Sequence, residues 1–222
     1  MTPNRMDLPT RRYLLISVLI LLFSVFIFQQ FADELTENEL FRFDQSVIDW
    51  VQGFINPQVT IIMKAFTFLG STTALSLLLI ASVALMIGQQ KRWESLFLVI
   101  AIGGGMVFNL LLKWIFQRER PTLNRLIDAT GYSFASGHSM VSFIFYGMLG
   151  MLVYMFLASR LSKMITIMVS AVLILMIGTS RIYLGVHYPS DVIAGFAAGG
   201  VWLVICLMGL KLVLLYRGTE SL

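Results

Sequence analysis

The segment VIAGFAAGGVWLVICLMGLKLVLL, Val192–Leu215, decides the fold class of this chain. It holds one charged residue, Lys211, in a run as long as the ~20 apolar residues that a helix needs to cross a bilayer. Similar runs lie at about Tyr13–Phe31, Ser71–Gly88 (or from Val59), Ser95–Phe116, Met140–Ala158 and Ile165–Thr179. A backbone in hydrocarbon must satisfy its own hydrogen bonds, as a helix does. The sequence therefore predicts an all-α, polytopic bundle of six transmembrane helices, with residues 1–222 forming a single domain.

The composition agrees with a membrane protein and argues against other classes. Hydrophobic residues make up 58% of the chain and charged residues 13%, too few charges for a soluble domain of this length. The formal charge of +4 suits anionic membrane lipids. Because basic residues never run longer than two, nucleic acid is not an expected partner, and no protein partner is evident. The single cysteine, Cys206, lies inside the last run, where we expect it to pack.

Lysine and arginine positions predict how the bundle sits in the membrane. With the N-terminus inside, inner segments hold nine of the 16 basic residues and outer segments seven. Three of the seven, Lys113, Arg120 and Arg181, have another explanation given below. The positive-inside rule then places both termini in the cytoplasm. The first run follows Arg11 and Arg12 as a signal peptide would, but its length and the lack of a cleavage site favour a retained span.

The first outward connection carries a second periodic pattern. Thr36 and Glu39 have the spacing of a capping box. After them, apolar residues recur at helical spacing, and acidic residues are expected on the other faces. The apolar set is Leu40, Phe43, Val47, Val51 and Phe54, and the acidic set is Glu37, Asp44 and Asp49. This pattern predicts an extracytoplasmic interfacial helix, either a packing lid, which we favour, or a route for lipid entry.

Three polar clusters fall in outward-facing segments. They are KWIFQRERP at 113–121, SGH at 136–138 and SRIYLGVHYPSD at 180–191. The predicted topology brings all three to one face of the membrane. Lys113 and Arg120 are seven residues apart, so two helical turns would place them on one side of a helix. A lysine so close to a span is expensive unless it is paired or functional.

These clusters have the chemistry of a phosphate site. Arg120 and Arg181 can each offer two parallel donors to phosphate oxygens. Ser136, Gly137 and His138 stand at a helix start, where backbone N–H groups and the helix dipole attract anions. Single residues of this kind are more often structural, as interfacial anchors or packing groups. Their joint placement favours a site for a transferring phosphoryl group.

The two histidines of the chain, His138 and His187, both fall in these clusters. Asp191 follows His187 by four residues, with Pro189 placed to open the next helix. A carboxylate at that distance can accept the imidazole N–H and hold the ring. His187 could then attack phosphorus to form a phosphohistidine, and His138 could protonate the departing oxygen.

The combined string closely resembles the three-part signature of the type 2 phosphatidic acid phosphatase family, which includes bacterial phosphatidylglycerophosphate and undecaprenyl diphosphate phosphatases. The motif core is Lys113–Gly199. The resemblance implies that His187 is the nucleophile, that Asp191 supports it, and that His138 is the general acid. It assigns phosphate binding to Lys113, Arg120, Ser136, Gly137 and Arg181, and implies no metal and no cofactor. One position departs from the family, because Ala135 stands where proline usually opens the second motif.

These observations predict an integral membrane phosphatase that acts on a lipid phosphate or diphosphate. An outward-facing site favours undecaprenyl diphosphate, with phosphatidylglycerophosphate or phosphatidic acid next. The alternative from another class is a transporter or binder of anionic lipid headgroups, although binding alone needs no oriented imidazole. A haloperoxidase is a third reading, but those relatives are large soluble chains.

Overall fold

The computed structural model describes residues 8–36, 40–122 and 124–218 of the chain. Within these ranges it holds eight α-helices and no β-strand, which confirms the all-α prediction. The helices are α1 Leu8–Thr36, α2 Phe41–Gln52, α3 Pro57–Leu69, α4 Thr72–Gly88, α5 Arg92–Phe116, α6 Gly137–Phe156, α7 Arg160–Tyr183 and α8 Pro189–Tyr216.

Five helices, α1, α5, α6, α7 and α8, are each long and apolar enough to cross a membrane. Helices α3 and α4 meet the same criterion as a pair, bent by 51° at their junction, so six spans result when the pair counts as one. The bend lies at Gly70 and Ser71, where the Ser71 Oγ accepts the N–H of Ala74 at 3.2 Å and so begins a new helix. All six predicted runs therefore fall on helices.

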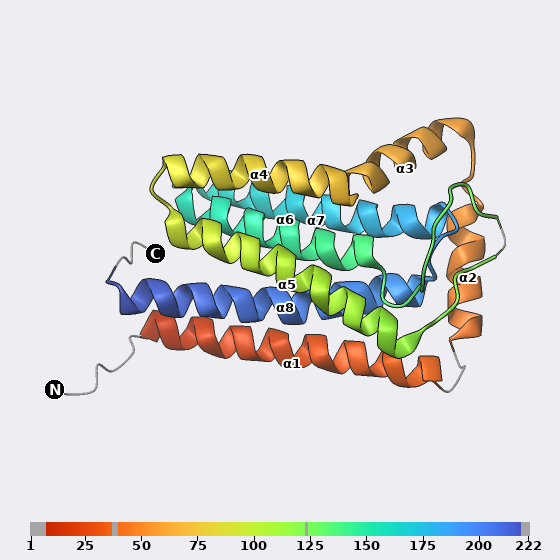
Figure 1. The fold of residues 1–222 in the computed structure, drawn as a ribbon, viewed down its shortest axis with the longest axis horizontal. Helices are drawn as coiled ribbons and strands as arrows, with labels where there is room; N and C mark the ends of the chain where they lie inside the picture. The colour runs from red at the N-terminus through yellow and green to blue at the C-terminus, as the bar shows by residue number, and fades with distance from the viewer. Residues whose placement is uncertain (1–7, 37–39, 123, 219–222) are drawn as a thin grey trace.

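Helix α2 is the predicted interfacial helix, and it crosses the ends of the spanning helices (Figure 1). The predicted faces of this helix were wrong for Asp44, Phe43 and Phe54, and right for Leu40, Val51 and the exposed Asp49. Asp44 is 2% exposed and lies buried with Leu40 and Val51, whereas Phe43 is 40% and Phe54 56% exposed. Residues 40, 44, 47 and 51 share one helical face, so the carboxylate belongs to the face that packs on the bundle. The predicted Thr36–Glu39 capping box lies outside the described residues, as does Glu37.

The centre of the bundle is α6, which packs against α5, α7 and α8. Its contact with α8 is close because α8 presents glycines to the α6 backbone. A Cβ at Gly195 would stand 2.9 Å from the Ser136 carbonyl oxygen, and one at Gly199 2.9 Å from that of Met140. Glycines at such positions let helix backbones approach in lipid. This approach sets the start of α6 against the start of α8.

The polar ends of several helices meet at one end of the bundle. The last turns of α5 and α7 and the first turns of α6 and α8 lie at this end, next to α2. Helix α1 begins and α8 ends at the opposite end (Figure 1). The long segment between α5 and α6, drawn green, runs across the same end (Figure 1). This arrangement brings the three polar motifs together.

Candidate active site

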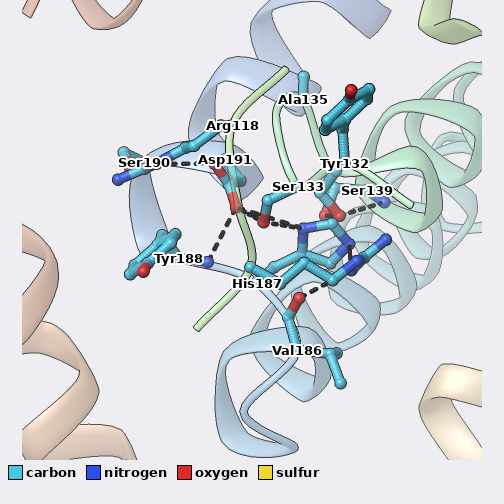
Figure 2. Close-up of polar contacts among 12 residues, drawn as sticks. Arg118, Tyr132, Ser133, Ala135, Ser139, Val186, His187, Tyr188, Ser190 and Asp191 are labelled. Atoms are coloured by element: carbon cyan, nitrogen blue, oxygen red, sulfur yellow. Dashed lines mark hydrogen bonds and ion pairs between the residues drawn. The ribbon is translucent and has the colours of Figure 1, made fainter. Parts of the chain in front are cut away.

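His187 lies in the short turn between α7 and α8 and is 2% exposed. Its backbone N–H donates to the Arg181 carbonyl at 3.3 Å, so the end of α7 holds it in place. On the ring, Nδ1 lies 3.3 Å from Asp191 Oδ2 and 3.2 Å from Ser133 Oγ (Figure 2). The other ring nitrogen, Nε2, lies 2.9 Å from Arg120 Nη1.

These contacts determine the protonation of the His187 ring. Arg120 can only donate, so Nε2 must carry a lone pair, and Nδ1 carries the proton that Asp191 accepts. Burial lowers the pKa of His187 to about 4, although the hydrogen bond and charge of Asp191 oppose the shift. The ring is therefore neutral at pH 7, with its free lone pair directed toward a guanidinium. That is the state a nucleophile needs.

Asp191 occupies the third position of α8 and is fully buried. Its Oδ2 accepts the Tyr188 N–H at 3.0 Å, which caps the helix, and also accepts the Ser133 hydroxyl (Figure 2). Its Oδ1 pairs with Arg118 Nη1 at 2.7 Å. Because Pro189 starts α8 as predicted, His187 and Asp191 stand one turn apart and meet as the sequence indicated.

Arg120 does not lie on a helix, which corrects the reason given for its pairing with Lys113. Helix α5 ends at Phe116, and Gln117 takes a left-handed backbone conformation with φ 44°. Pro121 also disfavours helical geometry in the residue before it. Lys113, in the last turn of α5, donates to the carbonyl oxygens of Tyr132 and Ser133. The two cations still act electrostatically on one another across the site.

Arg120 reaches the site from the loop and ties several segments together. Its Nε donates to the Gly131 carbonyl at 2.9 Å and its Nη2 to the Thr130 carbonyl at 3.1 Å. Its Nη1 donates to the Val186 carbonyl at 2.8 Å, beside the contact with His187. The guanidinium is thus fixed between the α5–α6 segment and the His187 turn.

The second motif forms the start of α6, which begins at Gly137, three residues before the predicted span. Ser136 is its N-cap, and the Ser136 Oγ accepts from the Ser139 hydroxyl at 2.9 Å. The Ser136 N–H donates to the Asp191 carbonyl at 3.0 Å, which joins the starts of α6 and α8. In the described part of the chain the His138 ring has no hydrogen-bond partner. It is free to serve a ligand.

The position that departs from the family motif, Ala135, is fully buried and anchored from α5. Asn109 Nδ2 donates to the Ala135 carbonyl at 3.0 Å. A Cβ at Gly137 would stand 2.9 Å from Asn109 Oδ1, so glycine is needed for this contact. The Asn109 amide therefore holds the turn where a proline would otherwise restrict the backbone.

Arg181 lies in the last turn of α7 and is 5% exposed. Its Nη1 donates to the Thr67 hydroxyl on α3, whereas its Nε is buried without a hydrogen-bond partner among the described residues. A buried charged donor without a partner is costly and marks a place for a ligand. By contrast, the Ser180 hydroxyl donates to the Ile177 carbonyl of its own helix at 2.6 Å, so it is a packing residue.

A pocket of about 270 Å³ opens beside His138. It lies between the α3–α4 bend, α5 and α6, and its wall is mostly apolar. The lining residues are Gly70, Thr72, Leu75, Met106, Asn109, Leu110, Gly137, His138 and Val141. Leu110 is 65% exposed on the outer surface of α5, so the pocket borders the lipid-facing side of the bundle. The pocket therefore joins the lipid-facing side of α5 to the His138 imidazole.

The structure brings all eight residues singled out from the sequence to one end of the bundle. The positive charges of Arg181, Arg120 and Lys113 all act on His138. Five further residues of the site were missed: Asp44, Thr67, Asn109, Arg118 and Ser133. The 40–44–47–51 spacing could have pointed to Asp44, and Arg118 lies inside the first motif. Thr67, Asn109 and Ser133 have no local signal in a single sequence.

Among the described residues, no cluster of three or more histidine, cysteine, aspartate or glutamate side chains could hold a metal ion. The charged centre consists instead of cations around His187. Arg120 and Arg181 act on a neutral His187 imidazole whose Nε2 lone pair faces Arg120, and Lys113 and the N-terminus of α6 lie at the same end of the bundle. Such an arrangement can bind a phosphoryl group and attack it.

Residues 94–212 match the family model of the PAP2 superfamily. The chain is also 32% identical over 145 residues to phosphatidylglycerophosphatase B of Bacillus subtilis, a match that covers 64% of this chain and 71% of the relative. The chain belongs to the PAP2 superfamily. This is the type 2 phosphatidic acid phosphatase family that the three motifs resemble, so that prediction is confirmed.

Other PAP2 proteins are similar in sequence and in fold. The putative undecaprenyl-diphosphatase YbjG of Escherichia coli is 36% identical over 111 residues, which is 46% of this chain and 52% of the relative. The crystal structure of the PAP2-type phosphatidylglycerolphosphate phosphatase of B. subtilis matches with a TM-score of 0.75 at 25% identity, over 86% of this chain and 94% of that one. Aquifex aeolicus LpxE matches with a TM-score of 0.61 at 26% identity, over 73% and 93%.

Proposed function

We propose that this PAP2 lipid phosphatase removes the terminal phosphoryl group of undecaprenyl diphosphate through a phosphohistidine on His187, without a metal. His187 Nε2 attacks phosphorus as the bond from phosphorus to the leaving oxygen breaks, and His138 gives that oxygen its proton. Water then attacks the phosphohistidine and gives a proton to His138, which breaks the bond between phosphorus and Nε2, releases inorganic phosphate and restores both histidines. Asp191 holds the imidazole and stabilises the positive charge that develops on it.

The observation that carries this proposal is the orientation of His187. Its Nδ1 side is held by Asp191 and Ser133, and its Nε2 lone pair faces Arg120. A protein that only binds anionic headgroups would need cations but no imidazole held in one tautomer. The geometry therefore favours catalysis over the alternative of a transporter or binder.

The cations around His187 supply the phosphate-binding site. The unpartnered Arg181 Nε is a donor that a phosphate oxygen would satisfy. Arg120, Lys113 and the first backbone N–H groups of α6, at Gly137 and His138, add positive potential from other sides. We assign Ser136 to capping this helix start, so that its N–H groups stay directed at the ligand.

The pocket beside His138 supports a lipid as the leaving group. A general acid must stand next to the oxygen that departs, and the lipid chain begins at or near that oxygen. From His138 the pocket continues along Leu75, Met106 and Val141 toward the lipid-facing side of α5. Acyl and isoprenoid chains both fit such an apolar wall, so the pocket supports the class of substrate and not one member.

The choice among lipid substrates rests on the membrane face at which the site lies and on the substrates for which the relatives are named. The positive-inside contrast supports a site on the extracytoplasmic face, where undecaprenyl diphosphate is released, and the E. coli relative carries that substrate in its name. Phosphatidylglycerophosphate is the second candidate, because the B. subtilis relative, which matches more of the chain, is named for it. Phosphatidic acid belongs to the same class.

Rapid quench with labelled substrate in detergent tests the mechanism and the substrate together. Wild-type protein should form an acid-labile, base-stable phosphoprotein with at least one of the three lipids. His187→Ala should abolish it, whereas the exposed α2 variant Asp49→Asn should behave as wild type. His138→Ala should slow the step by ~10²-fold or more, least for the diphosphate, whose leaving group needs less protonation.

Two results would contradict the proposal. A phosphoprotein that persists in His187→Ala would mean that another residue is the nucleophile. Wild-type protein that binds the three lipids and releases phosphate from none would favour the non-catalytic binder.

A further inference from the structure

Arg118 pairs with two buried carboxylates at the site, yet the phosphate-binding roles leave it unused. Its Nη1 pairs with Asp191 Oδ1 at 2.7 Å, and its Nη2 pairs with Asp44 Oδ2 at 2.7 Å. Nη1 also donates to the Ser190 hydroxyl at 2.7 Å. The guanidinium stacks on the Tyr188 ring, 3.9 Å from its centroid. Both of its terminal nitrogens are therefore bonded to side chains of the protein.

Asp44 joins this network from α2. Its Oδ1 accepts the Ser190 backbone N–H at 2.8 Å, and its Oδ2 accepts the Ser190 hydroxyl at 2.7 Å. Ser190 is the second residue of α8, so Asp44 caps α8 from another helix and places a negative charge at its N-terminus. The side chains of Asp44 and Asp191 are 3% and 0% exposed, and that of Arg118 is 14% exposed. Water therefore screens this charge chain little.

The two oxygens of Asp191 have separate partners as a result. Oδ1 belongs to Arg118, and Oδ2 accepts from Ser133, the Tyr188 N–H and His187 (Figure 2). A carboxylate fixed at one oxygen cannot rotate, so the other stays directed at the imidazole. The positive charge of Arg118, 2.7 Å from Oδ1, also compensates the negative charge of this buried carboxylate. An ionised, fixed Asp191 is what the His187 tautomer requires.

We propose that Arg118 and Asp44 are positioning residues that act on the reaction through Asp191, and that α2 takes part in catalysis by holding this pair. The inference rests on the proposed function, since it assigns its effect to phosphohistidine formation. Neither side chain touches the phosphoryl group. Both act by holding the carboxylate that orients the nucleophile.

A double-mutant cycle separates this role from general support of the fold. Arg118→Gln should slow phosphoenzyme formation by about 10-fold to 100-fold, because it removes charged hydrogen bonds to a buried carboxylate. Asp44→Asn should slow it less, and Arg118→Lys should recover part of the rate. In an Asp191→Asn background the same changes should cost less than about threefold, because the group they act through is gone. Arg42→Gln and Asp49→Asn, exposed on α2, are the matched controls.

The readout is the single-turnover rate of phosphoprotein formation in protein that is monodisperse in detergent, with vanadate inhibition measured in parallel. Vanadate inhibition should change by less than about threefold in the Arg118 and Asp44 variants, since oxyanion binding uses other residues. If Arg118→Gln is not monodisperse, Arg118→Lys and Asp44→Asn carry the same comparison. Equal slowing in both backgrounds, or no slowing in wild-type background, would overturn the positioning role. Wild-type protein that forms no phosphoprotein would instead refute the proposed function.

Discussion

Replacing Arg120 with lysine tests whether the shape of the guanidinium matters beyond its charge. The arginine serves four acceptors from three nitrogens: the carbonyls of Thr130, Gly131 and Val186, and His187 Nε2. A lysine ends in one nitrogen, so it can occupy at most one of these three donor positions. The bonds made by the other two nitrogens are then lost, at least two in number.

The expected magnitude follows from this count. Two of the contacts lie at the exposed rim of the site, so we take about 1 kcal/mol for each lost bond, the typical net value of a hydrogen bond and less than that of a buried charged one. A loss of about 2 kcal/mol lowers kcat/KM by about 30-fold, at about 1.4 kcal/mol for each factor of ten. Loss of the fixed, planar guanidinium beside His187 Nε2 should raise the vanadate inhibition constant in parallel.

Both constants are measured on purified protein in detergent, with lipid phosphate as substrate and with vanadate as a competing phosphoryl analogue. Arg42→Lys, at an exposed position of α2, makes the same chemical change away from the site and should leave both constants unchanged. Equal vanadate inhibition in wild type and Arg120→Lys would refute the assignment of Arg120 to the phosphoryl group. A large effect in Arg42→Lys would show that any loss of guanidinium disturbs the protein.

Three further predictions concern the state, the chemistry and the orientation of the site. The pKa of His187 is lowered to about 4, so its neutral form should persist from pH 7 down to about pH 5 and be lost as the pH falls through 4. Carbon-13 NMR of labelled histidine, assigned with His138→Ala, should show this, and a midpoint near 6.5 for His187 would contradict the burial argument. Activity should survive EDTA, because the charges assigned to the phosphoryl group come from side chains; full loss that Mg²⁺ restores would show a metal requirement. A cysteine at the exposed Thr122, with Cys206 replaced, should react with a membrane-impermeant thiol reagent on intact cells, and labelling only after permeabilisation would place the site in the cytoplasm.

The sequence was sufficient to predict the spans and the polar residues that gather at one end of the bundle, but not the contacts that hold those residues in place. Apolar length predicts a span because the bilayer imposes it on each helix separately. The His187–Asp191 contact was also predictable, because both residues belong to one turn at the start of α8. The placement of Arg120 on a helix was wrong, because the end of α5 and the effect of Pro121 intervene.

The missed residues have partners far away in the chain. Asp44 lies in the 40–44–47–51 stripe, but a carboxylate there is understandable only with Arg118, which follows 74 residues later. The Arg181–Thr67 and Asn109–Ala135 contacts likewise join separate helices, 114 and 26 residues apart. Such pairs are set by tertiary packing, for which hydrophobic periodicity carries no information.

The bond between Asp44 and Ser190 joins residues 146 positions apart, and this separation bears on how the protein is made. During synthesis α2 leaves the ribosome long before α8, and until α8 is inserted the buried carboxylate of Asp44 lacks the helix start that it caps. Arg118 likewise cannot form its ion pair with Asp191, 73 residues further on, until α8 has been made. The network around Asp191 is therefore completed only when α8 is inserted, so a chain stopped before its final span would keep His187 but lack the carboxylate that contacts it.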